Sequence, residues 1–364
     1  MADTTVVVIA SIKVKAGSEE RARTLLQSVA QAAGVTLAAD ASWLAPALTP
    51  PAGRVPRSDA YEATEKLVTT LLDLPGVPGH EWRVRNAIRA SLPKWAADRA
   101  VVDSAGNLIV AVGPDKDSVA FVAHTDEVSF EVDSILPDGH VTLTRKGGVI
   151  PSAWEGQPAM LVFDPDASGN TNEALRGVFV PRETARSKAP PRLLAWFGLD
   201  AAGLTARGVK TGAAVLGLKR AARLAGTRVT GRSSDDRTGS TALVLAARKI
   251  VPTTLNHKVI LVWTTGEEGG LLGARAFAAR SGAGLRRVYA IDTFVSSDTP
   301  LEQPTFAYAP LGKGAVLRGL DDGSIAPRAE RDRVMRIAKA NNIPLQVGTT
   351  HGSTDGSAVG AYGA

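Results

Sequence analysis

Several stretches of the chain are almost wholly apolar, and each is followed by acidic or histidine side chains. Three such runs are residues 119–123 (VAFVA), 259–263 (VILVW) and 288–291 (VYAI). The polar residues that follow them are His124 and Asp126, then Glu267 and Glu268, then Asp292. Near-continuous apolar runs are typical of buried strands in parallel sheets, and open α/β sheets bind ligands at the carboxyl ends of their strands. The pattern therefore predicts an α/β sheet with a metal site along one rim.

Helical periodicity surrounds these runs. The predicted helices are residues 61–74, 81–92 and 237–250. The third follows the acidic pair Asp235 and Asp236, and residues 75–80 (PGVPGH) predict a tight turn between the first two. Residues 101–112 predict a hairpin that turns at residues 104–107.

The sequence pattern changes in the middle of the chain, where short β-like segments alternate with turns rich in Gly, Pro and Asp. The pieces are residues 141–143, 159–163, 177–180, 213–218 and 227–229. This spacing predicts a small β-barrel or sandwich. The expected domains are an α/β domain formed by residues 58–138 and 231–364, with a β domain inserted at residues 139–230.

The first 57 residues read as a separate appendage. Residues 5–14 predict a strand and residues 18–33 a helix, while residues 43–57 hold four prolines and predict a linker. The opening resembles the start of the antibiotic biosynthesis monooxygenase family over about 30 residues, but it carries no catalytic motif of that family.

Composition narrows the function classes. A hydrophobic content of 44% can fill a core, and the absence of cysteine excludes disulfides, zinc–thiolate sites and cysteine nucleophiles. The net charge of +6 comes mainly from scattered arginines; the one basic cluster, residues 219–228, fits a solvated face better than a nucleic-acid site. No apolar run reaches about 18 residues, and no signal-peptide pattern opens the chain. We expect a cytoplasmic protein that binds neither nucleic acid nor membrane.

Each polar cluster has a simpler structural interpretation beside the chemical one. His124 and Asp126 face the same side of an extended chain, so Asp126 could hold the imidazole through its second nitrogen; the alternative is a surface turn. Asp235 could bridge two cations, but an acidic pair before a helix also suits N-capping and the positive helix end.

The pair Glu267 and Glu268 is the sharpest signal. Adjacent like charges after an apolar strand are costly unless a cation or a proton compensates. One glutamate could then bind metal while the other takes a proton from the attacking water. The alternative is a polar loop between strand and helix. Asp292 alone reads more simply as a strand end, but all the clusters share one topological position.

The order of these motifs resembles peptidase family M42, the glutamyl-aminopeptidase and TET-type aminopeptidases. The strings that carry the resemblance are AHTDEV (residues 123–128), SSDDRTG (233–239), TGEEGGLLGA (265–274), AIDTF (290–294) and GSTDGSAVG (352–360). The ordered set is specific, although each string alone is only moderately so.

The resemblance implies a zinc-exopeptidase-like sheet sandwiched by helices, with the inserted barrel serving for dimerisation. It implies peptide substrates, two divalent metal ions (zinc, cobalt or manganese) and a homo-oligomer between a dimer and a dodecamer. The implied roles are Asp235 as the bridge between the metals, His124 and Asp292 as ligands of the first, Glu268 as ligand of the second, Glu267 as general base and Asp126 as support of His124.

One departure from the family pattern concerns the second metal. The family takes a final histidine from an RYxHS-like stretch beyond the TDG motif, and His351 lies before that motif. The other histidines, His80, His140 and His257, do not match either. We therefore expect a chain truncated at its C-terminus and short of one ligand. The alternatives are an exopeptidase or deacylase of the M28 or M20 type, or a catalytically impaired homologue.

Overall fold

A computed structural model describes residues 59–181, 192–224, 228–295 and 309–361. The chain divides into two units, residues 1–55 and 56–364, and every described residue belongs to the second. The strand predicted at residues 5–14, the helix at 18–33 and the linker at 43–57 therefore lie outside the described residues.

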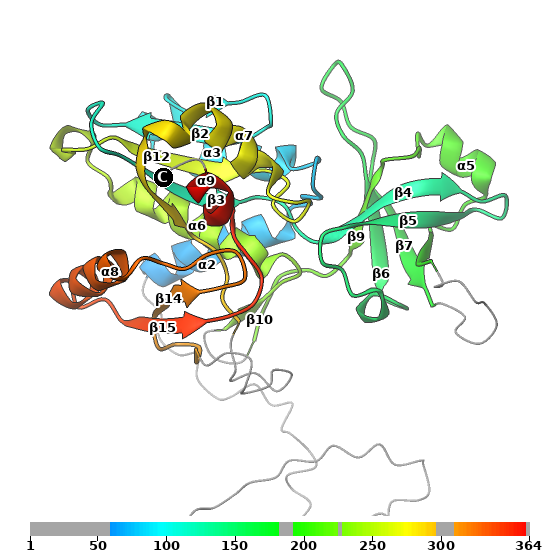
Figure 1. The fold of residues 1–364 in the computed structure, drawn as a ribbon. Coiled ribbons are helices and arrows are strands. Elements are labelled where there is room, and N and C mark those ends of the chain that lie inside the picture. The colour runs from blue at the N-terminus through cyan, green and yellow to red at the C-terminus, as the bar shows by residue number, and fades with distance from the viewer. Residues whose placement is uncertain (1–58, 182–191, 225–227, 296–308, 362–364) are drawn as a thin grey trace, which may run out of the picture. The chain divides into compact units, whose positions relative to one another are not determined.

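A five-stranded sheet forms the centre of the α/β part (Figure 1). Its strands are β1 (Val101–Val102), β2 (Leu108–Val112), β3 (Ser118–His124), β12 (Val259–Thr264) and β13 (Leu285–Ala290), in the order β1-β2-β12-β3-β13. Both β12 and β13 run parallel to β3, and Thr264 pairs with His124. The three apolar runs therefore end on one rim, as their sequence pattern predicted.

Helices cover both faces of this sheet because its central strands are apolar on both sides. One layer comprises α2 (Asp59–Asp73), α3 (Trp82–Ser91) and α6 (Ser234–Lys249), and the other comprises α7 (Leu272–Ser281) and α9 (Asp355–Gly360). Along β12, Leu261 and Trp263 pack into the first layer while Ile260 and Val262 pack into the second. This alternation follows from the two-residue period of a strand.

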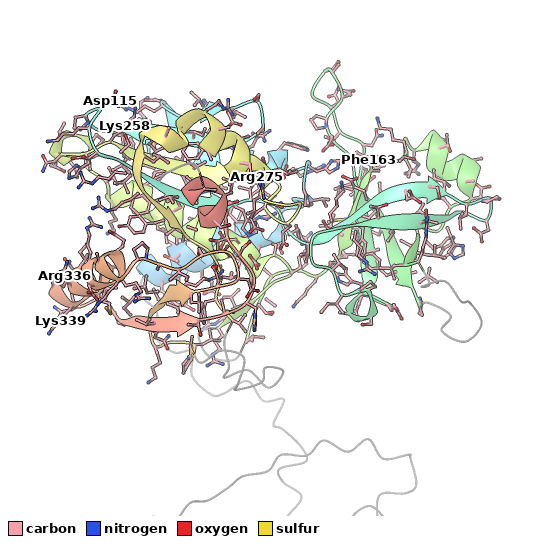
Figure 2. The ribbon with its side chains drawn as sticks, in the orientation of Figure 1. Asp115, Phe163, Lys258, Arg275, Arg336 and Lys339 are labelled. Atoms are coloured by element: carbon pink, nitrogen blue, oxygen red, sulfur yellow. The ribbon has the colours of Figure 1, made fainter. Side chains whose placement is uncertain are left out.

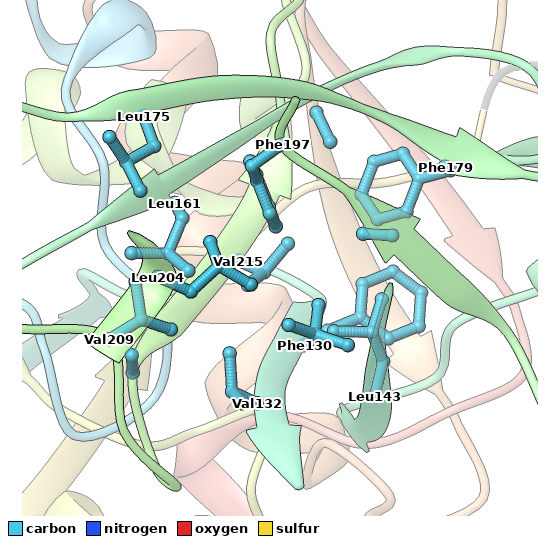
Figure 3. Packing of buried hydrophobic residues seen from close by; sticks show 14 of the residues in the cluster. Phe130, Val132, Leu143, Leu161, Leu175, Phe179, Phe197, Leu204, Val209 and Val215 are labelled. Carbon is cyan, nitrogen blue, oxygen red and sulfur yellow. The ribbon is translucent and has the colours of Figure 1, made fainter. Parts of the chain in front are cut away.

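A closed barrel interrupts the α/β part between β3 and α6. Its strands are β4 (Ser129–Ile135), β5 (His140–Lys146), β6 (Pro158–Val162), β7 (Leu175–Val180), β8 (Leu194–Trp196) and β9 (Ala214–Gly217). Phe130, Phe179 and Leu161 point into its core, as Figure 3 shows. The ring of Trp154 stands edge-on to Phe130 and Phe179, each at a centroid distance of 5.3 Å. The short helix α5 (Ala201–Ala206) precedes β9.

The barrel begins earlier in the chain than the sequence indicated. The expected boundary between residues 138 and 139 falls inside the β4–β5 hairpin, because β4 pairs with both β5 and β9 and carries Phe130 and Val132 into the core. Barrel strands end at Gly217, and β10 (Ala222–Arg223) and β11 (Val229–Thr230) form a separate ribbon.

The remaining elements precede β1 or follow β13 along the chain. The parallel strands β14 (Ala315–Leu320) and β15 (Leu345–Thr349) are connected through α8 (Arg328–Ala340), from which Arg336 and Lys339 project (Figure 2). The one-turn helix α4 (Lys94–Ala97) precedes β1. Lys258, just before β12, pairs with Asp115 at 2.8 Å (Figure 2). Within the described ranges, no helix is long and apolar enough to cross a membrane.

Candidate metal centre

Three predicted ligands meet at the rim of the sheet. His124 ends β3, Asp292 follows β13, and Asp235 lies in the first turn of α6. One potential ligand atom from each lies within 4.8 Å of those of the other two. The chain brings them together because β3 and β13 are parallel neighbours and α6 packs on β3.

The two acids at the start of α6 have different contacts. Neither Asp235 nor Asp236 has helical backbone angles, and the peptide bond between them is cis. Asp236 is buried and accepts the backbone N–H of Gly239 at 3.0 Å, which is the capping interaction considered from the sequence. Burial holds its pKa well above the usual range. Asp235 is thereby left to face the other clusters.

His124 and Asp235 form an ion pair. His124 Nε2 lies 2.9 Å from Asp235 Oδ1. Burial acts to lower the pKa of His124, but hydrogen bonding to Asp126 and Asp235 outweighs it and raises the pKa well above the usual range. Desolvation acts to raise the pKa of Asp235, and the hydrogen bond from His124 overcomes it and lowers the pKa. A metal ion bound at His124 Nε2 would displace the proton that lies between His124 and Asp235.

The neighbouring carboxyl groups resist ionisation. Burial, together with nearby acids, raises the pKa of Glu267 to about 8, that of Glu268 to about 7 and that of Asp292 to about 6. A divalent cation among them would reverse this effect, because opposite charge favours the ionised carboxylate. The donor set of one imidazole and several carboxylates without thiolate fits zinc, cobalt or manganese.

Asp126 connects two of the predicted clusters. Its Oδ1 and Oδ2 accept the backbone N–H groups of Glu267 and Glu268, each at 3.0 Å. Its Oδ1 also lies 3.4 Å from His124 Nδ1. The sequence indicated that Asp126 could support the His124 imidazole; the bonds to the glutamate loop were not foreseen.

Two buried acids near the site were not singled out from the sequence. Asp355 accepts a hydrogen bond from Thr264 Oγ1, and burial raises its pKa to about 7. Its position in the GSTDGSAVG string was the one signal that could have identified it. Glu81 Oε1 accepts the N–H groups of Gly79 and Gly266, both at 2.9 Å. The pattern at Glu81 indicated only the first turn of a helix.

A buried ion cluster surrounds Glu127, the residue that follows Asp126. Glu127 receives Arg232 Nε at 2.8 Å, Arg237 Nη2 at 3.5 Å and the backbone N–H of Gly76 at 3.1 Å. Two buried guanidinium groups therefore compensate one buried carboxylate. The cluster ties the turn after α2 to the chain that follows His124.

The other histidines pair with acids elsewhere. His80 contacts Asp164, His140 contacts Asp138, His257 contacts Asp117 and His351 contacts Asp322. Among the residues with described positions, His124 is the histidine that joins a cluster with metal-binding geometry.

The chain is also similar in sequence to known proteins. The sequence model of the M42 glutamyl aminopeptidase family matches residues 106–364. A putative aminopeptidase of Acetivibrio thermocellus is 26% identical over 291 residues, which cover 77% of this chain and 81% of that protein. The lysyl aminopeptidase of Pyrococcus furiosus is 25% identical over 296 residues, which cover 78% and 80% of the two chains.

Solved structures share the fold. The Pyrococcus horikoshii TET1 peptidase, which can assemble into a tetrahedron or a large octahedral shell, is 30% identical with a TM-score of 0.70, over 81% of this chain and 87% of that one. An aminopeptidase from the archaeon Desulfurococcus kamchatkensis superposes with a TM-score of 0.73 at 24% identity, over 83% and 84% of the two chains. The second likeness, at its lower identity, concerns the fold alone.

Proposed function

The chain belongs to the M42 glutamyl aminopeptidase family of peptide hydrolases, and we propose that it removes N-terminal residues from peptides at a two-metal site. The observation that carries the proposal is the convergence of His124, Asp235 and Asp292 within 4.8 Å. The adjacent pair Glu267 and Glu268, with its raised pKa values, supports it.

We assign His124, Asp235 and Asp292 to the first metal, and Asp235 and Glu268 to the second. Asp235 suits a bridging role because a carboxylate has two oxygens. The metals would be zinc, cobalt or manganese; when bound, they polarise the peptide carbonyl and make water a nucleophile near neutral pH.

Glu267 is the proposed general base. A base works best when its pKa lies near the working pH; burial raises the pKa of Glu267 to about 8 without metal, and bound cations would lower it from there. Its carboxylate accepts the proton of the attacking water and then passes it to the departing amine. Asp126 accepts the backbone N–H of Glu267 and so holds the backbone from which the Glu267 side chain extends.

The second metal has two proposed ligands among the described residues, and the first has three. Asp235 and Glu268 alone would hold the second metal more weakly than His124, Asp235 and Asp292 hold the first. A catalytically impaired homologue is therefore the competing outcome, and the metal stoichiometry distinguishes the two.

We also propose that the chain forms a homo-oligomer, with the barrel as its assembly domain. The support is the TET1 peptidase of Pyrococcus horikoshii, which can assemble into a tetrahedron or a large octahedral shell and shares this fold. Light scattering after size-exclusion chromatography measures the assembly directly, and a monomer at micromolar concentration would contradict it.

The decisive experiment measures bound metal and hydrolysis of aminoacyl-p-nitroanilides with and without Co²⁺, Zn²⁺ or Mn²⁺. Glu267→Gln should retain metal and lose about 10²–10⁴-fold in kcat, the usual contribution of a general base. Asp322→Asn, which alters an exposed acid paired with His351, serves as the control. Unchanged activity in Glu267→Gln would refute the assignment. Equal cleavage of N-acetylated substrates would indicate a deacylase or an endopeptidase instead.

A further inference from the structure

The barrel approaches the candidate centre through a glycine. Gly147 follows β5, and a Cβ atom at its position would lie 3.0 Å from Glu268 Cβ and 3.0 Å from Glu268 Oε2. The same Cβ would lie 3.0 Å from Val128 Cγ1. Real Cβ atoms rarely approach neighbours so closely, so any side chain here would require a neighbour to move.

The backbone at Gly147 could not easily move away from Glu268 to make room for a side chain. Lys146, which precedes it, pairs with Ser129 in the barrel and binds Glu131 Oε2 through Nζ at 2.8 Å. Val149, which follows it, is buried in the barrel core and donates its N–H to Gly147 O at 2.9 Å. The loop is therefore anchored at both ends.

Glu268 is held on its other side. Its backbone N–H is bonded to Asp126 Oδ2 at 3.0 Å, so the start of its side chain is fixed. A Cβ atom added at Gly147 would lie against both Cβ and Oε2 of Glu268, so rotation of the carboxylate alone would not remove the overlap. The Glu268 side chain therefore occupies space that is available only because residue 147 has no side chain.

We infer that Gly147 of the barrel is a positioning residue for Glu268: because it has no side chain, it leaves the space in which the Glu268 carboxylate can reach the metal centre. The inference rests on the proposed function, because it assumes that Glu268 is a metal ligand. It also gives the barrel a part in the chemistry beyond assembly, because the loop that contains Gly147 bounds one side of the space around the Glu268 side chain.

The chain supplies matched controls. A Cβ atom added at Gly148, the next residue, would meet no atom of the described residues within 4 Å, so Gly148→Ala tests a methyl group in the same loop. Gly147 has a φ of +85°, which disfavours alanine by itself. Gly212, also in the barrel, has a φ of +84°, and a Cβ atom there would likewise enter space that the described residues leave open. Gly212→Ala therefore reproduces the backbone cost without the contact.

The experiment compares Gly147→Ala, Gly148→Ala, Gly212→Ala and Glu268→Gln in the full chain. Metal affinity is measured by calorimetric titration with Co²⁺, and kcat and KM with an aminoacyl-p-nitroanilide. We expect Gly147→Ala to reproduce the direction of the Glu268→Gln defect, with metal affinity at the affected site and kcat each at least about tenfold below wild type. The two control variants should remain within about twofold of wild type.

The outcomes separate the two levels of the proposal. If Glu268→Gln leaves metal binding and activity unchanged, the assignment of Glu268 in the proposed function is wrong, and the inference is wrong with it. If Glu268→Gln is defective while Gly147→Ala matches Gly212→Ala in metal affinity and kcat, only the inference is overturned. A loss of thermal stability in Gly147→Ala without loss of metal affinity would likewise overturn it.

Discussion

Asp126 Oδ2 accepts the backbone N–H of Glu268 at 3.0 Å, and Asp126 Oδ1 accepts that of the preceding glutamate, 141 positions further along the chain than Asp126. A single buried carboxylate thus fixes the loop after β12 relative to the chain after β3. Because His124 Nδ1 lies 3.4 Å from the same carboxylate, one side chain orients a proposed ligand and the proposed base together.

Replacing Asp126 should therefore damage activity, although Asp126 is assigned as a ligand to neither metal. Asp126→Asn keeps one acceptor oxygen but places an NH₂ group against a backbone N–H. We expect a loss of about 1–3 kcal/mol in the free energy of unfolding, the usual cost of a buried unsatisfied group, and a fall in kcat. Urea unfolding and steady-state kinetics measure both. An Asp126→Asn variant with wild-type kcat would show that the loop holds its position without this carboxylate.

The pH dependence of stability follows from the crowded acids. The folded-state pKa values of Glu267 and Glu268, about 8 and about 7, exceed the value of about 4.3 for an unfolded glutamate. The folded protein therefore binds more protons than the unfolded chain in this range, and the stability that these protons contribute is fully present below about pH 4 and is lost as pH rises toward about 8. The raised pKa of His124 acts in the same direction, above its unfolded value.

We accordingly expect the melting temperature of the metal-free protein to fall between about pH 5 and about pH 8. Each bound Zn²⁺ or Mn²⁺ should raise it at the upper pH by about 3–5 °C at roughly a hundredfold excess over Kd. At the lower pH the increase should be smaller, because protons compete for the ligands. Scanning calorimetry with and without a chelator provides the comparison, and a metal effect independent of pH would contradict the account.

The rim of the sheet was predictable from the sequence, whereas the contacts between loops were not. An apolar run such as residues 259–263 is long enough to indicate a buried strand, and its end places Glu267 near His124. The bond from Asp126 to that loop depends on the tight conformation of residues 265–270, where Gly266 has a φ of +61°. No periodicity encodes such a contact.

The barrel, too, was predictable from the sequence only in part. Alternating short pieces indicated its β character, but the strand β4 was not foreseen because its residues directly follow the AHTDEV string. Its membership of the barrel is decided by pairing with β9, which lies about 80 residues further along the chain. Long-range pairing of this kind leaves little trace in local pattern.

Asp355 provides a test of the buried charge. Its Oδ2 accepts from Thr264, its Oδ1 has no hydrogen-bond partner within the described part of the chain, and burial raises its pKa to about 7. Asp355→Asn removes the ionisable proton while retaining an acceptor for Thr264. We expect it to stabilise the metal-free protein more at about pH 8 than at about pH 5.5, by a further ~1–3 kcal/mol, because the unfolded aspartate is ionised at both pH values whereas the folded Asp355 becomes ionised only above about pH 7. The effect should be smallest at about pH 4. Chemical denaturation at the two pH values measures this, and equal destabilisation at both would disprove it.

Glu81 should affect catalysis from a position remote in sequence. Its Oε1 accepts from Gly79 and from Gly266, so it ties the turn before α3 to the residue that precedes Glu267. Glu81→Gln retains the accepting oxygen and should keep kcat within about threefold. Glu81→Ala leaves two N–H groups without their acceptor, at roughly 1–3 kcal/mol for each that stays buried, and should lower kcat at least tenfold.

The two Glu81 variants discriminate between the acceptor and the charge. Glu62→Ala, at an exposed position on α2, is the control for loss of a glutamate. Kinetics at a temperature well below the melting point of the weakest variant separate misplacement of Glu267 from unfolding. If Glu81→Gln is as defective as Glu81→Ala, the negative charge matters rather than the accepted bonds. If both variants are fully active, the Gly266 N–H does not fix the base, and the position of Glu267 is set by Asp126 alone.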